Sequence, residues 1–165
     1  MSTLDASLPS APRLEGVPPH LLIVRAPYYA AVVNGLRDGA ARILTDAGAS
    51  YDVLDVAGAL ELAGAVRLAL RGRRRYHGYV ALGCVVKGET DHYEFVCREA
   101  MAGLTAVALQ FALCLGNGLL TVATLAQAEA RSGRDWHDKG GPNKGAEAAA
   151  AALRQIAAAR WLGAE

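Results

Sequence analysis

One stretch of the chain decides the fold: Tyr79-Val80-Ala81-Leu82-Gly83-Cys84-Val85-Val86-Lys87-Gly88-Glu89-Thr90-Asp91-His92. Its first four residues form a continuous apolar run, which is typical of a strand buried on both faces of a sheet. Glycines and polar residues follow, and an apolar pattern at helical spacing begins near Asp91. A buried strand that leads directly into a helix predicts a parallel sheet covered by helices.

The same alternation extends in both directions from this stretch. Further strands are predicted at residues 21–24, 51–56 and 118–122, and helices at 32–47, 58–70, 91–111, 125–130 and 146–161. We therefore expect an α/β fold, a three-layer α/β/α sandwich with a central four-stranded parallel sheet and flavodoxin-like topology. Such sheets bind ligands beyond the carboxyl ends of their strands, so functional residues are sought there.

Composition indicates a folded chain without a strong field. The chain has 165 residues, of which 53% are hydrophobic and 20% charged, and its net charge is +1. This balance predicts neither nucleic acid nor a membrane as a partner. The basic run 71–75 is interpreted as cations at a helix C-terminus, with a nucleic-acid patch as the alternative. Residues 1–19, with four prolines, are predicted to be a flexible tail, and residues 20–165 a single domain.

The cysteines and the first residues bear on location. Cys84, Cys97 and Cys114 are an odd number without CxxC spacing, which favours thiols in a reducing compartment over disulfides or a zinc site. No apolar stretch approaches 20 residues, and the first residues do not resemble a signal peptide. We therefore expect a cytoplasmic protein without a metal.

Two short segments at the predicted strand ends could bind a ligand. Tyr28 follows the first strand, where its ring could stack on a flat ligand or simply be half-buried at the surface. The segment 57–61 opens a predicted helix with small residues, which let a ligand approach free backbone N–H groups. Within it, Glu61 could accept from sugar-like hydroxyls or only favour the helix dipole.

The loop predicted at 83–91 could hold an anion. Its glycine spacing is similar to a P-loop, but Glu89 stands where that motif requires Lys, which argues against nucleotide hydrolysis. His92, at the start of the next helix, could exchange protons near neutral pH or be structural. Farther along, Arg131 and Lys144 flank another loop and could bind phosphate or simply be solvated.

Together these segments resemble the 6,7-dimethyl-8-ribityllumazine synthase family of riboflavin biosynthesis. The family motifs stand here as Tyr28, then Gly58-Ala59-Leu60-Glu61, then Gly83 to His92, and finally Arg131-Ser132-Gly133 and Asn143-Lys144-Gly145. The resemblance covers about residues 21–160 in the same order. It departs from the family at Leu60 (usually Phe), Lys87 (usually Arg), Asn117 (usually aromatic or apolar) and in a longer loop after Gly133.

The resemblance implies an enzyme, a transferase without metal or organic cofactor. It condenses 5-amino-6-(D-ribitylamino)uracil with 3,4-dihydroxy-2-butanone 4-phosphate and releases phosphate and water. By position, the family roles fall on Tyr28 (pyrimidine stacking), Ala59, Leu60 and Glu61 (ribityl chain), Cys84, Val85 and Val86 (backbone to the uracil edge), Gly88, Glu89, Thr90 and Arg131 (phosphate), His92 (proton transfer), Lys144 (near the site) and Asn117 (from a neighbouring subunit).

The resemblance also implies partners. It implies a homopentamer with active sites between subunits and riboflavin synthase acting downstream. The longer stretch 134–142, with Trp136 and Pro142, favours an isolated pentamer over a capsid of twelve rings, with a dimer of pentamers as a further alternative. Two rival functions remain open: a paralogue that only binds a flavin or lumazine, and a flavodoxin-like electron carrier, for which the segment after the first strand lacks an anion loop.

Overall fold

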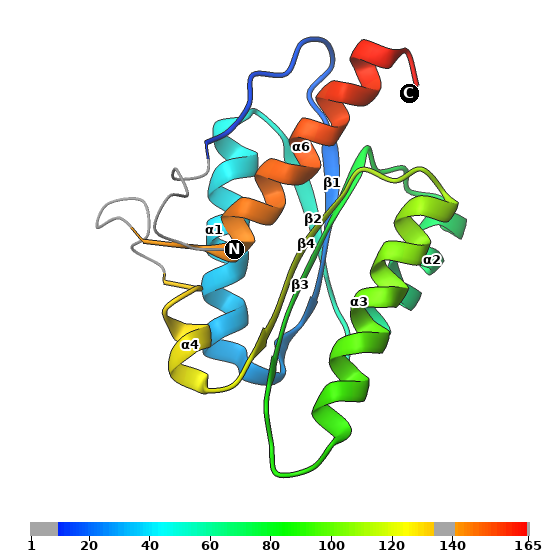
Figure 1. The fold of residues 1–165 in the computed structure, drawn as a ribbon. Helices are drawn as coiled ribbons and strands as arrows, with labels where there is room; N and C mark the ends of the chain where they lie inside the picture. The colour runs from blue at the N-terminus through cyan, green and yellow to red at the C-terminus, as the bar shows by residue number, and fades with distance from the viewer. Residues whose placement is uncertain (1–9, 134–140, 165) are drawn as a thin grey trace.

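Four parallel strands form one sheet in the order β2-β1-β3-β4 (Figure 1). They are seen in a computed structural model that describes residues 10–133 and 141–164. The strands are β1 (His20–Ala26), β2 (Ser50–Asp55), β3 (Gly78–Val86) and β4 (Leu115–Val122). The central pair, β1 and β3, is the most apolar and the most deeply buried, as expected of strands covered on both faces.

Helices cover both faces of the sheet. In chain order they are the 3-10 turn η1 (Pro27–Tyr29), α1 (Ala30–Asp46), α2 (Glu61–Arg71), α3 (His92–Gln110), α4 (Leu125–Glu129) and α6 (Lys144–Leu162). Helices α1, α4 and α6 lie on one face and α2 and α3 on the other (Figure 1), and each layer closes its own apolar core against the sheet. The predicted three-layer, flavodoxin-like α/β fold is confirmed.

Helices α1 and α6 approach each other at backbone distance. A Cβ added to Gly145 would lie 1.9 Å from the carbonyl oxygen of Leu36, so only glycine fits there. Asn143, fully buried just before α6, caps that helix by accepting from the N–H of Ala146 at 3.0 Å. Its amide donates to the carbonyls of Gly35 and Gly133, both at 3.0 Å. One side chain therefore joins α6, α1 and the segment before the loop.

Several predicted boundaries were wrong in ways that matter for the site. Strand β3 continues to Val86, so residues 83–86 are strand and only 87–91 connect it to α3. Strand β4 begins at Leu115, which places Asn117 inside a strand. Helix α2 begins at Glu61 rather than Gly58, and α6 begins at Lys144. Tertiary pairing with a neighbouring strand overrides the turn preference of a residue such as Gly83.

The predicted tail and the long loop are described only in part. Residues 10–19 contain no helix or strand and run along α6, where Arg160 donates to the carbonyls of Glu15 and Val17. Residues 1–9 lie outside the described part of the chain, as do residues 134–140 with Trp136. Within the described residues, no helix has the length and apolar character needed to span a membrane.

Candidate active site

A hollow of about 310 Å³ lies at the carboxyl ends of β1, β2 and β3. It is formed by η1, the turn before α2, the end of β3 and the first turns of α3. Its lining includes eight of the predicted site residues: Tyr28, Ala59, Cys84, Val85, Val86, Gly88, Thr90 and His92. The predicted strand-end location is where the structure brings these residues together.

The end of β3 presents an open backbone edge to this hollow. Pairing between β1 and β3 stops at Ala26 and Gly83, whereas β3 pairs with β4 as far as Val86. Pro27 explains the stop, because it has no N–H and its ring fixes φ, and it begins η1 instead of prolonging β1. Residues 84–86 therefore have no strand partner on the β1 side within the described part of the chain.

An aromatic ring stands beside this open edge. Tyr28 is 79% exposed, and its ring meets that of Tyr29 edge to face with centroids 5.2 Å apart. Most of the Tyr28 ring surface is therefore free to contact a ligand.

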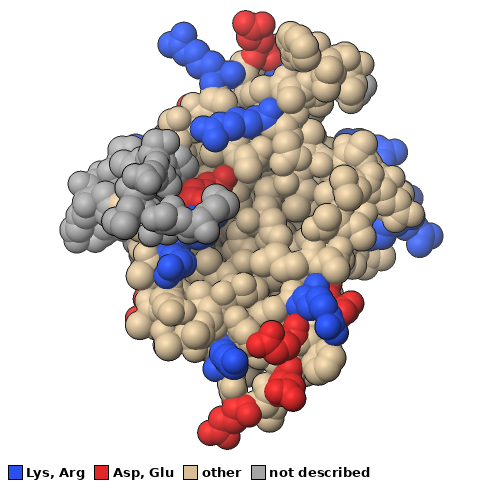
Figure 2. Space-filling view, in the orientation of Figure 1, with Lys and Arg blue, Asp and Glu red and all other residues tan. Residues whose placement is uncertain are grey.

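The opposite wall is the N-terminus of α3. His92 is the first residue of this helix, and the side chain of the preceding Asp91 forms no capping hydrogen bond. Free N–H groups of the first turn give this wall an affinity for anions. Nearby, Lys87 lies 3.8 Å from the carboxylate of Glu94. Positive and negative side chains alternate over this end of the molecule instead of forming one large patch (Figure 2).

Six of the predicted site residues do not line this hollow, and three of these six belong to segments that adjoin it. Leu60 is 48% exposed, Glu61 begins α2, and Glu89 lies in the exposed connection to α3. Glu61 is nevertheless close to the wall, since a Cβ on the lining residue Gly58 would lie 3.0 Å from its carboxylate. The Glu61 carboxylate therefore lies beside the wall of the hollow, next to Gly58.

The remaining predicted residues line a second hollow, on the outer edge of β4. Asn117, Arg131 and Lys144 surround it together with the β4 segment 118–122, and it shares no lining residue with the first. A backbone hydrogen bond of 2.9 Å from the N–H of Lys144 to the carbonyl of Arg131 holds the two cationic residues side by side. The predicted phosphate ligands are thus divided between two places on the chain.

Hydrogen bonds and an ion pair hold the three predicted site residues of the second hollow in place. Arg131 donates to the carbonyl of Gln127 at 2.8 Å, and the ammonium of Lys144 lies 2.6 Å from the Glu147 carboxylate. Asn117 accepts from the N–H of Leu119 at 2.9 Å. Arg131 and Lys144 are thus two cationic side chains in fixed positions at the outer edge of the sheet. They are suited to bind an anion that approaches this edge from outside the chain.

The thiol in the first hollow is not a nucleophile at neutral pH. Burial raises the pKa of Cys84 to about 11, so its thiolate is scarce. Burial also raises the pKa of Tyr93, which lines the same hollow and keeps its hydroxyl protonated. No cluster of three or more His, Cys, Asp or Glu side chains that could hold a metal occurs among residues 10–133 and 141–164.

Three lining residues, Tyr29, Tyr93 and Val96, were not among the predicted site residues. Tyr29 belongs to η1, which a helix pattern does not reveal. Val96 lies one helical turn after His92, so the i, i+4 spacing was a usable signal. Tyr93 has no such signal, because adjacent helical residues usually face different sides.

Comparison with known proteins shows the family to which this chain is related. The profile described as 6,7-dimethyl-8-ribityllumazine synthase matches residues 18–160. The chain belongs to this family. It is 44% identical over 152 residues to 6,7-dimethyl-8-ribityllumazine synthase 1 of Rhizobium meliloti (strain 1021), covering 90% of this chain and 96% of that one. It is also 44% identical to the synthase of Agrobacterium fabrum over 149 residues, covering 88% and 97%.

A third relative, the synthase of Paramagnetospirillum magneticum, is 41% identical over 149 residues, covering 87% of this chain and 96% of its own. The family predicted from the motifs is confirmed, and with it a lumazine synthase, an enzyme of riboflavin biosynthesis. The rival interpretation as an electron carrier is thereby displaced.

Proposed function

We propose that this chain condenses 5-amino-6-(D-ribitylamino)uracil with 3,4-dihydroxy-2-butanone 4-phosphate at the hollow beside β3. One observation carries the assignment: His92 lines the same hollow as the open edge of β3 and the exposed ring of Tyr28. The pyrimidine is a flat ring with hydrogen-bond donors and acceptors on its edge. Such a ring fits between the face of Tyr28 and the unpaired backbone of β3. Beside it, an imidazole can move protons near neutral pH.

The proposed residue roles follow from these positions. Tyr28 stacks on the pyrimidine, the backbone of residues 84–86 pairs with its edge, and Ala59, Leu60 and Glu61 face the ribityl chain. Gly88, Glu89 and Thr90 present backbone groups and a hydroxyl near the N-terminus of α3, where a phosphate is favoured. Arg131, Lys144 and Asn117 complete the site from a neighbouring subunit.

The chemistry needs few protein groups. The aryl amine attacks the ketone carbon, and loss of water gives an imine. Loss of the proton at C3 expels phosphate from C4 and leaves an enol, which tautomerises to a new carbonyl at C3. The ribitylamino nitrogen attacks this carbonyl, and loss of a second water closes the ring. His92 carries protons between these groups. Holding both reactants in register contributes several kcal/mol on the scale of intramolecular reactions.

A site shared between subunits is supported by the division of the cations from His92. Arg131 and Lys144 lie on the outer edge of β4, and the hollow they line has no residue in common with the one beside β3. A cyclic assembly would bring the β4 edge of one subunit to the open hollow of the next. We propose a homopentamer, which agrees with the family pattern.

The direct experiment mixes the purified protein with both substrates and follows lumazine fluorescence together with release of inorganic phosphate. Equal amounts of both products are expected, and omission of either substrate must abolish both signals. Binding of the pyrimidine without product would instead support the paralogue that only binds. Light scattering tests the assembly: a closed ring of five chains of 17.2 kDa has about 86 kDa.

If each active site is shared between two subunits, rings that contain two different inactive variants should regain part of the enzyme activity. Refolding His92→Ala together with Arg131→Ala in equal amounts should restore about a quarter of the wild-type activity, since one site in four then receives both intact residues. Each variant refolded alone is the control. Recovery absent from verified mixed rings would place both residues in one protomer's site.

We also propose where the enzyme is located in the cell and which enzyme uses its product. We place the enzyme in the cytoplasm, which is supported by three cysteines that form no disulfide. Its lumazine product is the substrate expected for riboflavin synthase, so that enzyme is the proposed partner in sequence.

A further inference from the structure

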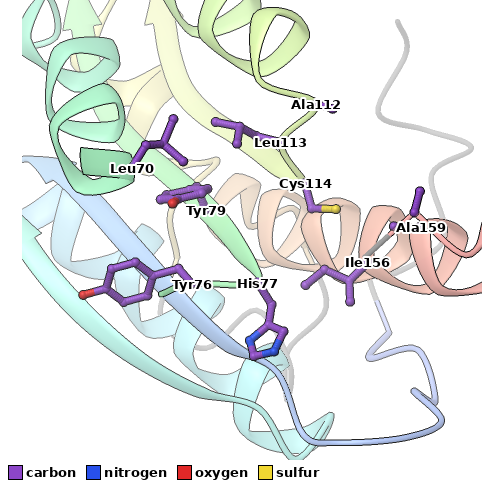
Figure 3. A pocket seen from close by; sticks show the side chains of 10 residues that line it. Leu70, Tyr76, His77, Tyr79, Ala112, Leu113, Cys114, Ile156 and Ala159 are labelled. Atoms are coloured by element: carbon purple, nitrogen blue, oxygen red, sulfur yellow. The ribbon is translucent and has the colours of Figure 1, made fainter. Parts of the chain in front are cut away.

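A further hollow, partly open to solvent, lies at the opposite end of the sheet from the hollow beside His92. There the C-terminal end of α2, the start of β3, the turn between α3 and β4 and the end of α6 surround a hollow of about 260 Å³ (Figure 3). Figure 3 shows Leu70, Tyr79 and Leu113 on one side and Ile156 and Ala159 on the other. No residue is shared with either hollow described above.

Most of the polar groups around this hollow are already used. Tyr76 donates its hydroxyl to the Asp52 carboxylate at 2.8 Å. The Nδ1 atom of His77 accepts from the N–H of His20 at 3.0 Å. The carbonyl of Cys114 accepts from the N–H of Tyr79 at 2.8 Å. These bonds fix the rim and leave the walls apolar.

Tyr79 is different because its side chain is buried but its hydroxyl is unused. The residue as a whole is only 3% exposed, and its hydroxyl forms no hydrogen bond with any group in the described part of the chain. The hydroxyl oxygen is not sealed from its surroundings, because Tyr79 lines the hollow, and the hydroxyl can therefore donate a hydrogen bond to a molecule bound there. Burial raises the pKa of Tyr79, which keeps the hydroxyl protonated as a donor over the neutral range.

The size and walls of the hollow define what would fit. An apolar cavity of about 150 Å³ holds a benzene ring, so this larger space accepts a ring with a substituent. The leucine, isoleucine and alanine side chains favour an uncharged aromatic ligand. The Tyr79 hydroxyl requires that the substituent accept a hydrogen bond.

We propose that this hollow is a binding site for a small, uncharged aromatic molecule carrying a carbonyl-type acceptor, which receives a hydrogen bond from Tyr79. The site lies at the amino ends of the strands, so it is separate from the condensation reaction. Binding at this hollow therefore does not depend on the proposed catalytic roles.

Two probes of nearly equal shape test the hydrogen bond. Acetophenone carries a carbonyl oxygen, and α-methylstyrene has a methylene group in its place. Their dissociation constants are measured by ligand-observed NMR on the wild-type assembly and on Tyr79→Phe. Tyr79→Phe should weaken acetophenone relative to α-methylstyrene by about 2- to 10-fold, the range of one neutral hydrogen bond. The quantity compared is the ratio of the two dissociation constants, acetophenone to α-methylstyrene, in Tyr79→Phe and in the wild type. Because the two probes differ in hydration by the same amount in both measurements, that difference cancels.

Two helix variants locate the binding. Ala159→Leu fills the hollow and should abolish saturable binding of both probes, whereas Ala158→Leu, on the exposed side of α6, should leave it unchanged. Three results would overturn the proposal. They are no saturable binding to the wild type, an unchanged probe ratio in Tyr79→Phe, or binding that survives Ala159→Leu and so occurs elsewhere, including the hollow beside His92.

Discussion

Replacing Asn143 by alanine should be among the most destabilising single changes in this chain. The substitution removes three hydrogen bonds of 3.0 Å from a fully buried position. Loss of the α6 cap costs about 1 kcal/mol, and each of the two lost amide bonds about another 1 kcal/mol. The expected loss is therefore about 3 kcal/mol, or a fall in Tm of about 6–12 °C for a chain of this size.

A second helix cap provides the matched control. Thr124 caps α4 through its hydroxyl, which accepts from the N–H of Gln127 at 3.3 Å, and the residue is exposed. Thr124→Ala should cost only about 0.5–1 kcal/mol. Urea unfolding followed by circular dichroism compares the two variants, at one protein concentration because the proposed assembly would contribute to stability. Equal losses in both variants would refute the reasoning from burial and bond number.

A double-mutant cycle sharpens the test. A Cβ at Gly39 would lie 2.3 Å from the side-chain oxygen of Asn143, so Gly39→Ala alone must displace that side chain. In the Asn143→Ala background this clash disappears. The two losses should therefore sum to clearly more than the loss in the double variant, and strict additivity would show that the residues do not share this contact.

Three further predictions concern the active site. His92→Ala should keep substrate binding and lose up to about 10²-fold in turnover, because positioning supplies most of the rate; a loss beyond about 10⁴-fold in steady-state assays would assign His92 another role. Arg131→Ala should raise the KM for the butanone phosphate far more than that for the pyrimidine, and equal increases would place Arg131 away from the phosphate. Cys84, whose pKa is raised by burial to about 11, should react with iodoacetamide at pH 8 at least about 100-fold more slowly than in the urea-unfolded chain; equal rates would contradict its burial.

The layers of the fold could be predicted because the spacing of apolar residues distinguishes buried strands from helices along most of the chain. The apolar run 79–82 and the helical spacing after Asp91 each favour one structure, and the sheet follows from their alternation. Boundaries were less predictable. Gly83 favours a turn locally, yet pairing with Leu119 keeps it in β3. Long-range pairing of this kind leaves no mark in the local pattern.

The site was predictable as a set of motifs but not as a shape. Motif order identified Arg131 and His92 together, whereas the structure places them on different hollows of one protomer. The distribution depends on which strand forms the edge of the sheet, and strand order is not encoded in motif spacing. Tyr79 illustrates the same limit, since an aromatic residue in a buried strand gives no sign that its hydroxyl has no partner among residues 10–133 and 141–164.

The early end of β1 has a consequence for how this chain can change over evolutionary time. If the substrate pairs with the backbone of residues 84–86, then substitutions there that preserve the strand leave the recognised atoms in place, and those side chains are free to vary. Selection instead falls on Pro27, which contacts no reacting atom in the proposed mechanism but keeps β1 from growing over the open edge. A change that lengthened β1 by two residues would close the site with every catalytic group still present. Loss of activity in a distant relative can therefore begin with the length of one strand.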